Sequence, residues 1–167
     1  MRTTLVLLFL LAGTLISCTM PAQTMTPVPP NASAMTVHVL RLRPGEDLKR
    51  ALDGYVATNA IEAAVIVSCV GSLDVASIRF ANRPEATSVP GKLEITGLVG
   101  MLSKSSGSHL HITVADGEGN ARGGHLMDGS LVYTTAEIAI GELTGVRFAR
   151  EKDATYGYNE LVVHPDP

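Results

Sequence analysis

The feature that most restricts the fold is a continuous apolar run at residues 63–70, Ala-Ala-Val-Ile-Val-Ser-Cys-Val, which is followed by Gly71 and Ser72. Its eight residues have the length of a strand, and it lacks the alternation expected of a strand with one face in water. Such a run is typical of a strand that is covered on both faces. It therefore predicts a central strand that ends at Gly71 and Ser72.

Other segments rich in β-branched and apolar residues follow one another along the chain, separated by turns rich in Gly, Ser and Asp. Residues 46–59 differ, because their apolar side chains recur every three or four positions from Leu48 to Val56, as on one face of a helix. Glu46 and Asp47 would lie in its first turn, where the helix dipole favours negative charge. The pattern predicts an α+β domain with a central, mostly antiparallel sheet and one or two packed helices. The expected strands cover residues 36–43, 63–70, 76–81, 92–102, 109–115 and 131–141.

The first seventeen residues have the pattern of an export signal. Arg2 supplies a positive charge, and residues 5–16 form a nearly unbroken apolar run. This run is shorter than the roughly 20 apolar residues that a membrane-spanning helix needs. We therefore expect residues 1–17 to be a signal peptide rather than a membrane span.

Cys18 follows this signal in a short motif, Leu15-Ile16-Ser17-Cys18, that resembles the bacterial lipobox. In that motif the cysteine thiol takes the lipid, and two or more acyl chains anchor a protein stably. We therefore expect a protein that is exported and lipid-anchored at Cys18 to a bacterial membrane. Thr19, in place of Asp, favours the periplasmic side of the outer membrane. The alternative is an ordinary signal peptide that is cut further on, for instance after Ala22, so that Cys18 is discarded.

These features divide the chain into four parts. Residues 1–17 are the signal peptide, and residues 18–35 are the lipidated cysteine and a tether, rich in Pro, Thr and Ala, without helical or strand periodicity. Residues 36–163 are enough for one domain with a hydrophobic core. Residues 164–167 are expected to be a tail.

Charge and cysteine content narrow the possible partners. Loss of Arg2 with the signal peptide leaves 12 basic residues against 16 acidic ones, a formal charge of −4. This balance argues against nucleic acid, which normally requires a basic face. With Cys18 lipidated, Cys69 has no cysteine to pair with, and its apolar neighbours favour a buried, inert thiol.

Three histidines form the main candidate for chemistry. His109 and His111 begin an expected strand, in which alternate side chains share one face. The Asp-Gly turn at residues 116–117 favours a hairpin, which would return His125 to that pair, and the two glycines before it would let the backbones come close. Three imidazoles with an open fourth position suit zinc or another divalent metal.

The spacing of these histidines also has a simpler explanation. A His-x-His pair is common by chance, and a third histidine fourteen residues later follows no strong spacing rule. On that interpretation the histidines are structural. His38 and His164 lie outside the group and are expected to be a strand residue and a tail residue.

A series of short motifs, in the same order, resembles the plant and prokaryote conserved (PPC) domain. The resemblance covers roughly residues 36–163, and several motifs in the right order are more specific than any single one. The motifs are Arg43-Pro44-Gly45-Glu46-Asp47-Leu48, Val70-Gly71-Ser72-Leu73, Gly91-Lys92-Leu93-Glu94-Ile95, His109-Leu110-His111, Gly123-Gly124-His125-Leu126, Thr135-Ala136-Glu137, Phe148-Ala149-Arg150-Glu151-Lys152-Asp153 and Gly157-Tyr158-Asn159-Glu160-Leu161.

The resemblance implies an α+β fold, a homotrimer and, as in prokaryotic members, a metal held by the residues matching His109, His111 and His125. Plant members pair this domain with a DNA-binding AT-hook, whose core Arg-Gly-Arg-Pro does not occur in this sequence. Residues 91–96, Gly-Lys-Leu-Glu-Ile-Thr, also differ from the Gly-Arg-Phe-Glu-Ile-Leu stretch by which plant members engage partners. The plant interactions are therefore not expected here.

Three hypotheses for function follow. The first is a trimeric metal-binding domain or metalloenzyme, in which zinc would lower the pKa of a bound water or polarise a substrate. Glu94 and Glu137 are candidate bases and Arg79 is a candidate anion contact, although such strand residues are more often solvated or paired with each other. The second is a non-catalytic ligand-binding or assembly module with structural histidines. The third is DNA binding by analogy with plant relatives, which charge and location oppose. No catalytic residue or substrate is assigned.

Overall fold

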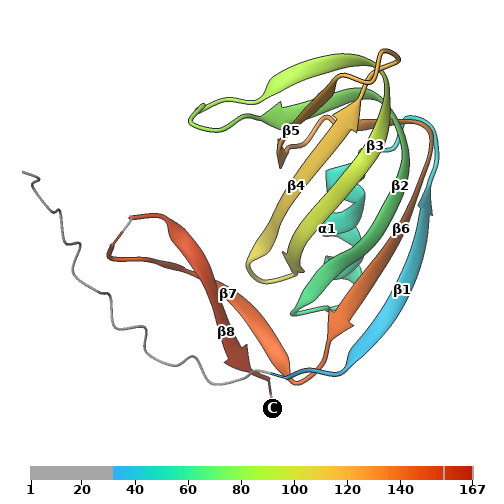
Figure 1. Cartoon of the computed structure of the whole chain (residues 1–167). Helices are drawn as coiled ribbons and strands as arrows, with labels where there is room; N and C mark the ends of the chain where they lie inside the picture. The colour runs from blue at the N-terminus through green and yellow to red at the C-terminus, as the bar shows by residue number, and fades with distance from the viewer. Residues whose placement is uncertain (1–31, 156, 167) are drawn as a thin grey trace, which may run out of the picture. The chain divides into compact units, whose positions relative to one another are not determined.

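The computed structural model describes residues 32–155 and 157–166 and contains a six-stranded sheet built around the central apolar run (Figure 1). The signal peptide, Cys18 and most of the tether lie outside the described residues. The elements are β1 (Met35–Leu42), α1 (Leu48–Thr58), β2 (Ala64–Arg79), β3 (Thr87–Ser103), β4 (Gly107–Ala115), β5 (Ala121–Leu126), β6 (Leu131–Leu143), β7 (Val146–Lys152) and β8 (Asn159–Pro165).

The strands of the main sheet pair antiparallel, in the order β1-β6-β2-β3-β4-β5. The end of β2 also pairs with β5, where Ile78 lies opposite Leu126 and Arg79 lies opposite His125. The sheet therefore curls until its last strand meets β2. Helix α1 lies against one face of this curved sheet (Figure 1). The predicted mostly antiparallel sheet is confirmed, and the described chain, which is mainly sheet, contains one of the one or two packed helices that the α+β prediction expected.

Strand β2 is one strand of 16 residues, not the two strands predicted at residues 63–70 and 76–81. Gly71 adopts φ +145°, and a Cβ at this position would overlap the carbonyl oxygen of Thr135 on β6. Glycine therefore allows a close approach between two strands, and the register of β2 against β6 shifts just after it. The residues expected to end a strand lie inside a longer one, at a shift of its register.

The two faces of β2 have different surroundings. Leu73 and Ile78 are fully buried in the core, together with Leu52 of α1. On the opposite face Val67 and Val70 are 51% and 56% exposed, although the sequence predicts a strand covered on both faces. Within the described chain α1 covers one face of the sheet, so these valines remain open to solvent.

Helix α1 begins at Leu48, because Asp47 is its N-cap. The Asp47 carboxylate accepts a hydrogen bond from the backbone N–H of Arg50 at 3.1 Å and another from that of Gly129 at 2.6 Å. The predicted acidic pair therefore precedes the first turn instead of occupying it. The predicted apolar face of the helix is confirmed, since its core residues are buried.

Cys69 is buried in β2, with 8% of its surface exposed, and it is a free cysteine. Burial raises the pKa of its thiol to about 11. The thiolate is the reactive form of cysteine, so the Cys69 thiol is protonated and unreactive at neutral pH. This agrees with the prediction from its apolar neighbours.

A hairpin of β7 and β8 follows the main sheet. Val146 and Phe148 pack with Ala63 in a small apolar cluster, against which Met101 of β3 is partly buried. Strand β8 extends to Pro165, so His164 is a strand residue, not part of a tail, and its Nε2 lies 3.2 Å from Glu151. The described part of the chain holds no helix that is long and apolar enough to cross a membrane.

Candidate metal centre and the adjoining cleft

Strand β4 positions two of the three candidate histidines. His109 and His111 alternate along it with Leu110 and Ile112, which are buried in the core. The two-residue period of a strand places both imidazoles on the face opposite the core. The expected shared face is therefore present.

The hairpin between β4 and β5 brings in the third histidine. The Asp116 carboxylate accepts a hydrogen bond from the backbone N–H of Asn120 at 2.8 Å, which stabilises the turn. His125 on β5 then lies directly opposite His111, and Arg79 on β2 lies opposite His125. Cross-strand partners project from the same face of a sheet, so these three side chains form one row.

The three imidazoles are close enough to share one metal ion. One ligand nitrogen from each of His109, His111 and His125 lies within 4.8 Å of the others. In a tetrahedral zinc site with Zn–N distances of about 2.1 Å, the ligand nitrogens are roughly 3.4 Å apart. Small side-chain rotations would therefore bring them into place. The donor set fits zinc or another divalent metal that accepts imidazole.

Two glycines make this close approach possible. A Cβ on Gly123 would lie 2.9 Å from the hydroxyl oxygen of Thr113 on β4. A Cβ on Gly124 would lie 2.7 Å from the backbone oxygen of Arg79 and 2.9 Å from a methyl carbon of Ile78 on β2. Strand β5 therefore sits between two strands at distances that leave little room for side chains, as the sequence predicts.

The surroundings of His109 and His125 favour the neutral imidazole, the form that binds metal. Burial, followed by the Arg150 guanidinium, lowers the pKa of His109, and Glu160 opposes this shift. Burial, followed by the Arg79 guanidinium, lowers the pKa of His125. Two arginines from different elements therefore act on the histidine cluster.

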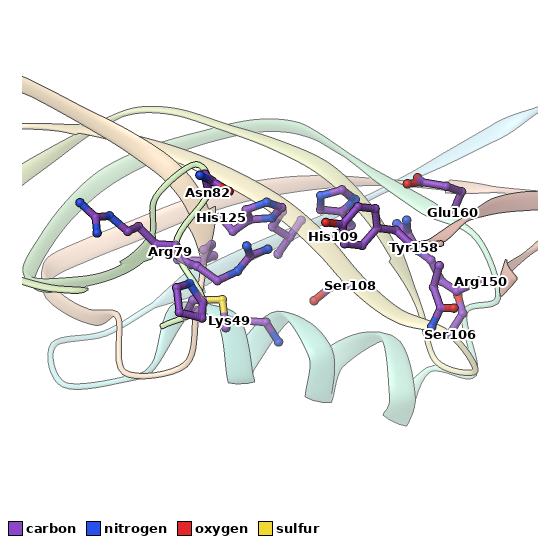
Figure 2. A pocket seen from close by; sticks show the side chains of 16 residues that line it. Lys49, Arg79, Asn82, Ser106, Ser108, His109, His125, Arg150, Tyr158 and Glu160 are labelled. Atoms are coloured by element: carbon purple, nitrogen blue, oxygen red, sulfur yellow. The ribbon is translucent and has the colours of Figure 1, made fainter. Parts of the chain in front are cut away.

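A cleft of about 1020 Å³ adjoins the cluster and is lined by His109 and His125. Figure 2 shows His109 between two groups, with Arg79 and His125 on one side and Tyr158, Arg150 and Glu160 on the other. Strands β2, β4 and β5 of the main sheet form one wall, and the β7–β8 hairpin supplies the second group. The cleft is thus built from segments far apart in the sequence.

The structure separates the other residues proposed from the sequence. Arg79 lies beside the histidines, as expected for an anion contact. Glu94 on β3 lies opposite Ala115 at the far end of β4, and Glu137 on β6 lies opposite Val70 of β2. Neither glutamate lines the cleft. Within the described chain the structure therefore gives no support to their proposed role as bases at the histidine site.

The hairpin residues of the cleft have no role predicted from the sequence. Arg150, Tyr158 and Glu160 occur in two of the motifs quoted above, but no spacing pattern relates them to the histidines. Only the packing of β7 beside β3 brings them to His109. The two motifs that contain these residues were the sequence signal that could have identified them as residues of the site.

Solved structures with the same fold include close and distant relatives. A hypothetical protein of Salmonella enterica is 40% identical, with a TM-score of 0.79 over 81% of this chain and 97% of the other. A metal-containing protein of Archaeoglobus fulgidus is 27% identical, with a TM-score of 0.67 over 78% and 96% of the two chains. A protein of Bacteroides thetaiotaomicron, described as a candidate DNA-binding protein, is 21% identical, with a TM-score of 0.65 over 79% and 98%, and shows the fold alone.

Curated relatives carry a similar segment within longer proteins. The bifunctional protein GlmU of a Synechococcus strain is 42% identical over 135 residues, which are 81% of this chain. The chain spans 22% of the length of that relative. The similarity therefore concerns one segment of GlmU.

A family profile covers most of the ordered domain. The profile of the Plants and Prokaryotes Conserved (PCC) domain, which the sequence motifs indicated, matches residues 30–144. This match includes the main sheet, α1 and all three histidines, and it ends before the β7–β8 hairpin. The chain belongs to the PCC domain family.

Proposed function

We propose that this PCC-domain protein binds a divalent metal, with zinc the best fit, through His109, His111 and His125. The observation that carries the proposal is that three imidazole nitrogens from two paired strands lie within 4.8 Å of one another. A neighbour with the same fold is described as metal-containing, which adds support. When bound, zinc supplies a Lewis acid that polarises an oxygen-bearing ligand.

Metal analysis tests this proposal directly. Elemental analysis of the purified full chain, in a non-ionic detergent and without a histidine tag, is expected to find near-stoichiometric zinc. His111→Ala is expected to lose it, because two imidazoles form an incomplete ligand set. His164→Ala is the matched control, since His164 pairs with Glu151 on the hairpin, and it should keep its zinc. No metal in the wild-type protein after loading and dialysis would refute the proposal.

We also propose that the protein assembles into a homotrimer, because several valines of the main sheet are exposed in the single chain. Val39, Val67, Val70 and Val99 are 80%, 51%, 56% and 63% exposed. Apolar side chains gathered on the open side of a sheet are typical of a surface that another chain covers. Light scattering on the zinc samples separates two functions. A trimer that persists in His111→Ala supports a metal site separate from assembly, whereas loss of the trimer supports histidines that serve assembly.

The N-terminal residues support a proposal about location. We expect Cys18 to carry lipid and to hold the protein on the periplasmic side of a bacterial outer membrane. Cys18→Ala should move the protein from the membrane fraction to the soluble periplasmic fraction, or leave it uncleaved in the inner membrane. A variant that still sediments with the outer membrane at wild-type levels would contradict the proposal. Substitution of Thr19 by Asp tests the choice of membrane.

DNA binding remains the least supported function. Two structural neighbours are described as candidate DNA-binding proteins, but both are below 25% identity. The chain carries a net charge of −3, and strong DNA binding needs basic residues along a face that follows the phosphates. The basic residues near the histidines line a cleft instead. Their arrangement favours a small ligand.

A further inference from the structure

The cleft beside the histidines gathers several positively charged side chains with few acidic ones. Arg79, Arg83 and Arg150 line it, and the side chain of none of them forms an ion pair or hydrogen bond with any residue that the structure describes. Glu160 is the only acidic side chain among the described lining residues. The cleft therefore presents three guanidinium groups against one carboxylate.

A fourth basic side chain in the cleft, in contrast to the arginines, is paired with carboxylates. Lys49 of α1 lies 2.7 Å from a carboxylate oxygen of Asp53 and 3.4 Å from one of Asp128. The charge of this lysine is therefore neutralised within the protein. The three arginines differ from it because no described carboxylate is placed to pair with them.

The arginines are also arranged around the histidine cluster. Arg79 is the cross-strand neighbour of His125, and Arg150 comes from the hairpin on the other side of His109 (Figure 2). Both arginines line the same cleft as His109 and His125. A group held between them would lie next to the three imidazoles.

We propose that this cleft binds a small organic anion, with Arg79 and Arg150 holding its carboxylate or phosphate group beside the histidines. The planar guanidinium donates paired hydrogen bonds that match both kinds of oxyanion. A cleft of about 1020 Å³ accommodates a ligand of metabolite size. Tyr158 and Asn159 on the hairpin add polar groups for the rest of such a ligand.

This proposal deepens the proposed function, because an anion in this position would lie beside the metal. The arginine contacts themselves need no metal, however. The two proposals therefore fail separately, and metal content and anion binding must be measured as independent quantities on the same protein.

Titration calorimetry with two simple anions tests the proposal. Inorganic phosphate and succinate are titrated into the full chain in detergent, with and without zinc. At least one of the two anions is expected to bind saturably. Arg79→Gln and Arg150→Gln are each expected to lower the affinity for that anion by on the order of tenfold or more, the effect of losing a charge-assisted contact. Binding of phosphate alone would assign a phosphate-bearing ligand, and binding of succinate alone would assign a carboxylate.

Matched controls separate these contacts from general charge effects. Arg122→Gln on β5 and Arg147→Gln on β7 remove the same charge from neighbouring positions that do not line this cleft. They should change anion affinity by less than about twofold. Three results would overturn the proposal: an equal loss of anion affinity in the control variants, unchanged anion affinity in Arg79→Gln, or no saturable binding of either anion. Anion binding that depends on Arg79 in a protein that holds no zinc would support it while refuting the metal site.

Discussion

Replacement of Gly100 by alanine is expected to lower the free energy of unfolding by about 3–5 kcal/mol. Gly100 adopts φ +140° in β3, a conformation that side chains with a Cβ rarely adopt. The added Cβ would overlap the backbone oxygen of His109 and lie 2.9 Å from the Cα of Leu110. Both contacts are to the backbone of β4, so the two strands must separate.

Urea denaturation followed by far-UV circular dichroism measures this loss, because the chain has no tryptophan for fluorescence. Protein concentration is kept constant, since assembly affects apparent stability. Gly54→Ala is the control, because Gly54 lies inside α1 and an added Cβ there would have no atom within 4 Å. It should stabilise the protein by roughly 0.5–1 kcal/mol. Equal stability of the two variants would contradict the packing of β3 on β4.

Replacement of Gly124 by alanine is expected to weaken zinc binding by roughly 10- to 100-fold, the range for residues that orient metal ligands. Its Cβ would lie 2.7 Å from the backbone oxygen of Arg79. Strand β5 pairs with β2 over a short stretch, at residues 78–79 and 125–126, so the methyl group should push this short contact apart. His125 would then move away from His109 and His111.

Competition with a zinc-binding dye measures the affinity. Gly117→Ala is the matched control, because Gly117 lies in the turn of the same hairpin with no atom within 4 Å of an added Cβ. It should bind zinc within about twofold of the wild type, since no ligand moves. If the Gly124→Ala protein is folded and binds zinc as tightly as the control, the position of His125 does not depend on the close contact between β5 and β2.

Much of the fold follows from local patterns. Short segments of β-branched residues between glycine-rich turns indicate strands, and the spacing from Leu48 to Val56 indicates one helix, because each pattern reflects a backbone period. The strand end predicted at Gly71 is wrong. A glycine can end a strand or lie within one where a neighbouring strand comes close, and at Gly71 the close approach of β6 decides this.

The histidine site was predictable for a similar reason. His109 and His111 share a face through the two-residue period of a strand, and a short hairpin returns His125 to them. The positions of Glu94 and Glu137 were not predictable, because no local rule states where their strands lie relative to β4. Strand order is a long-range property, and it places both of them outside the cleft.

The sequence by itself determined the helix, most strands of the main sheet, the hairpin that gathers three imidazoles, and the family, because these depend on contacts between residues near in the chain or on ordered motifs. The tertiary structure alone decided that β2 ends beside β5 and that the β7–β8 hairpin stands next to His109. Those two contacts put Arg79 and Arg150 on either side of the histidines. They join residues more than forty positions apart in sequence, where packing of the whole core, rather than any local period, sets which side chains meet.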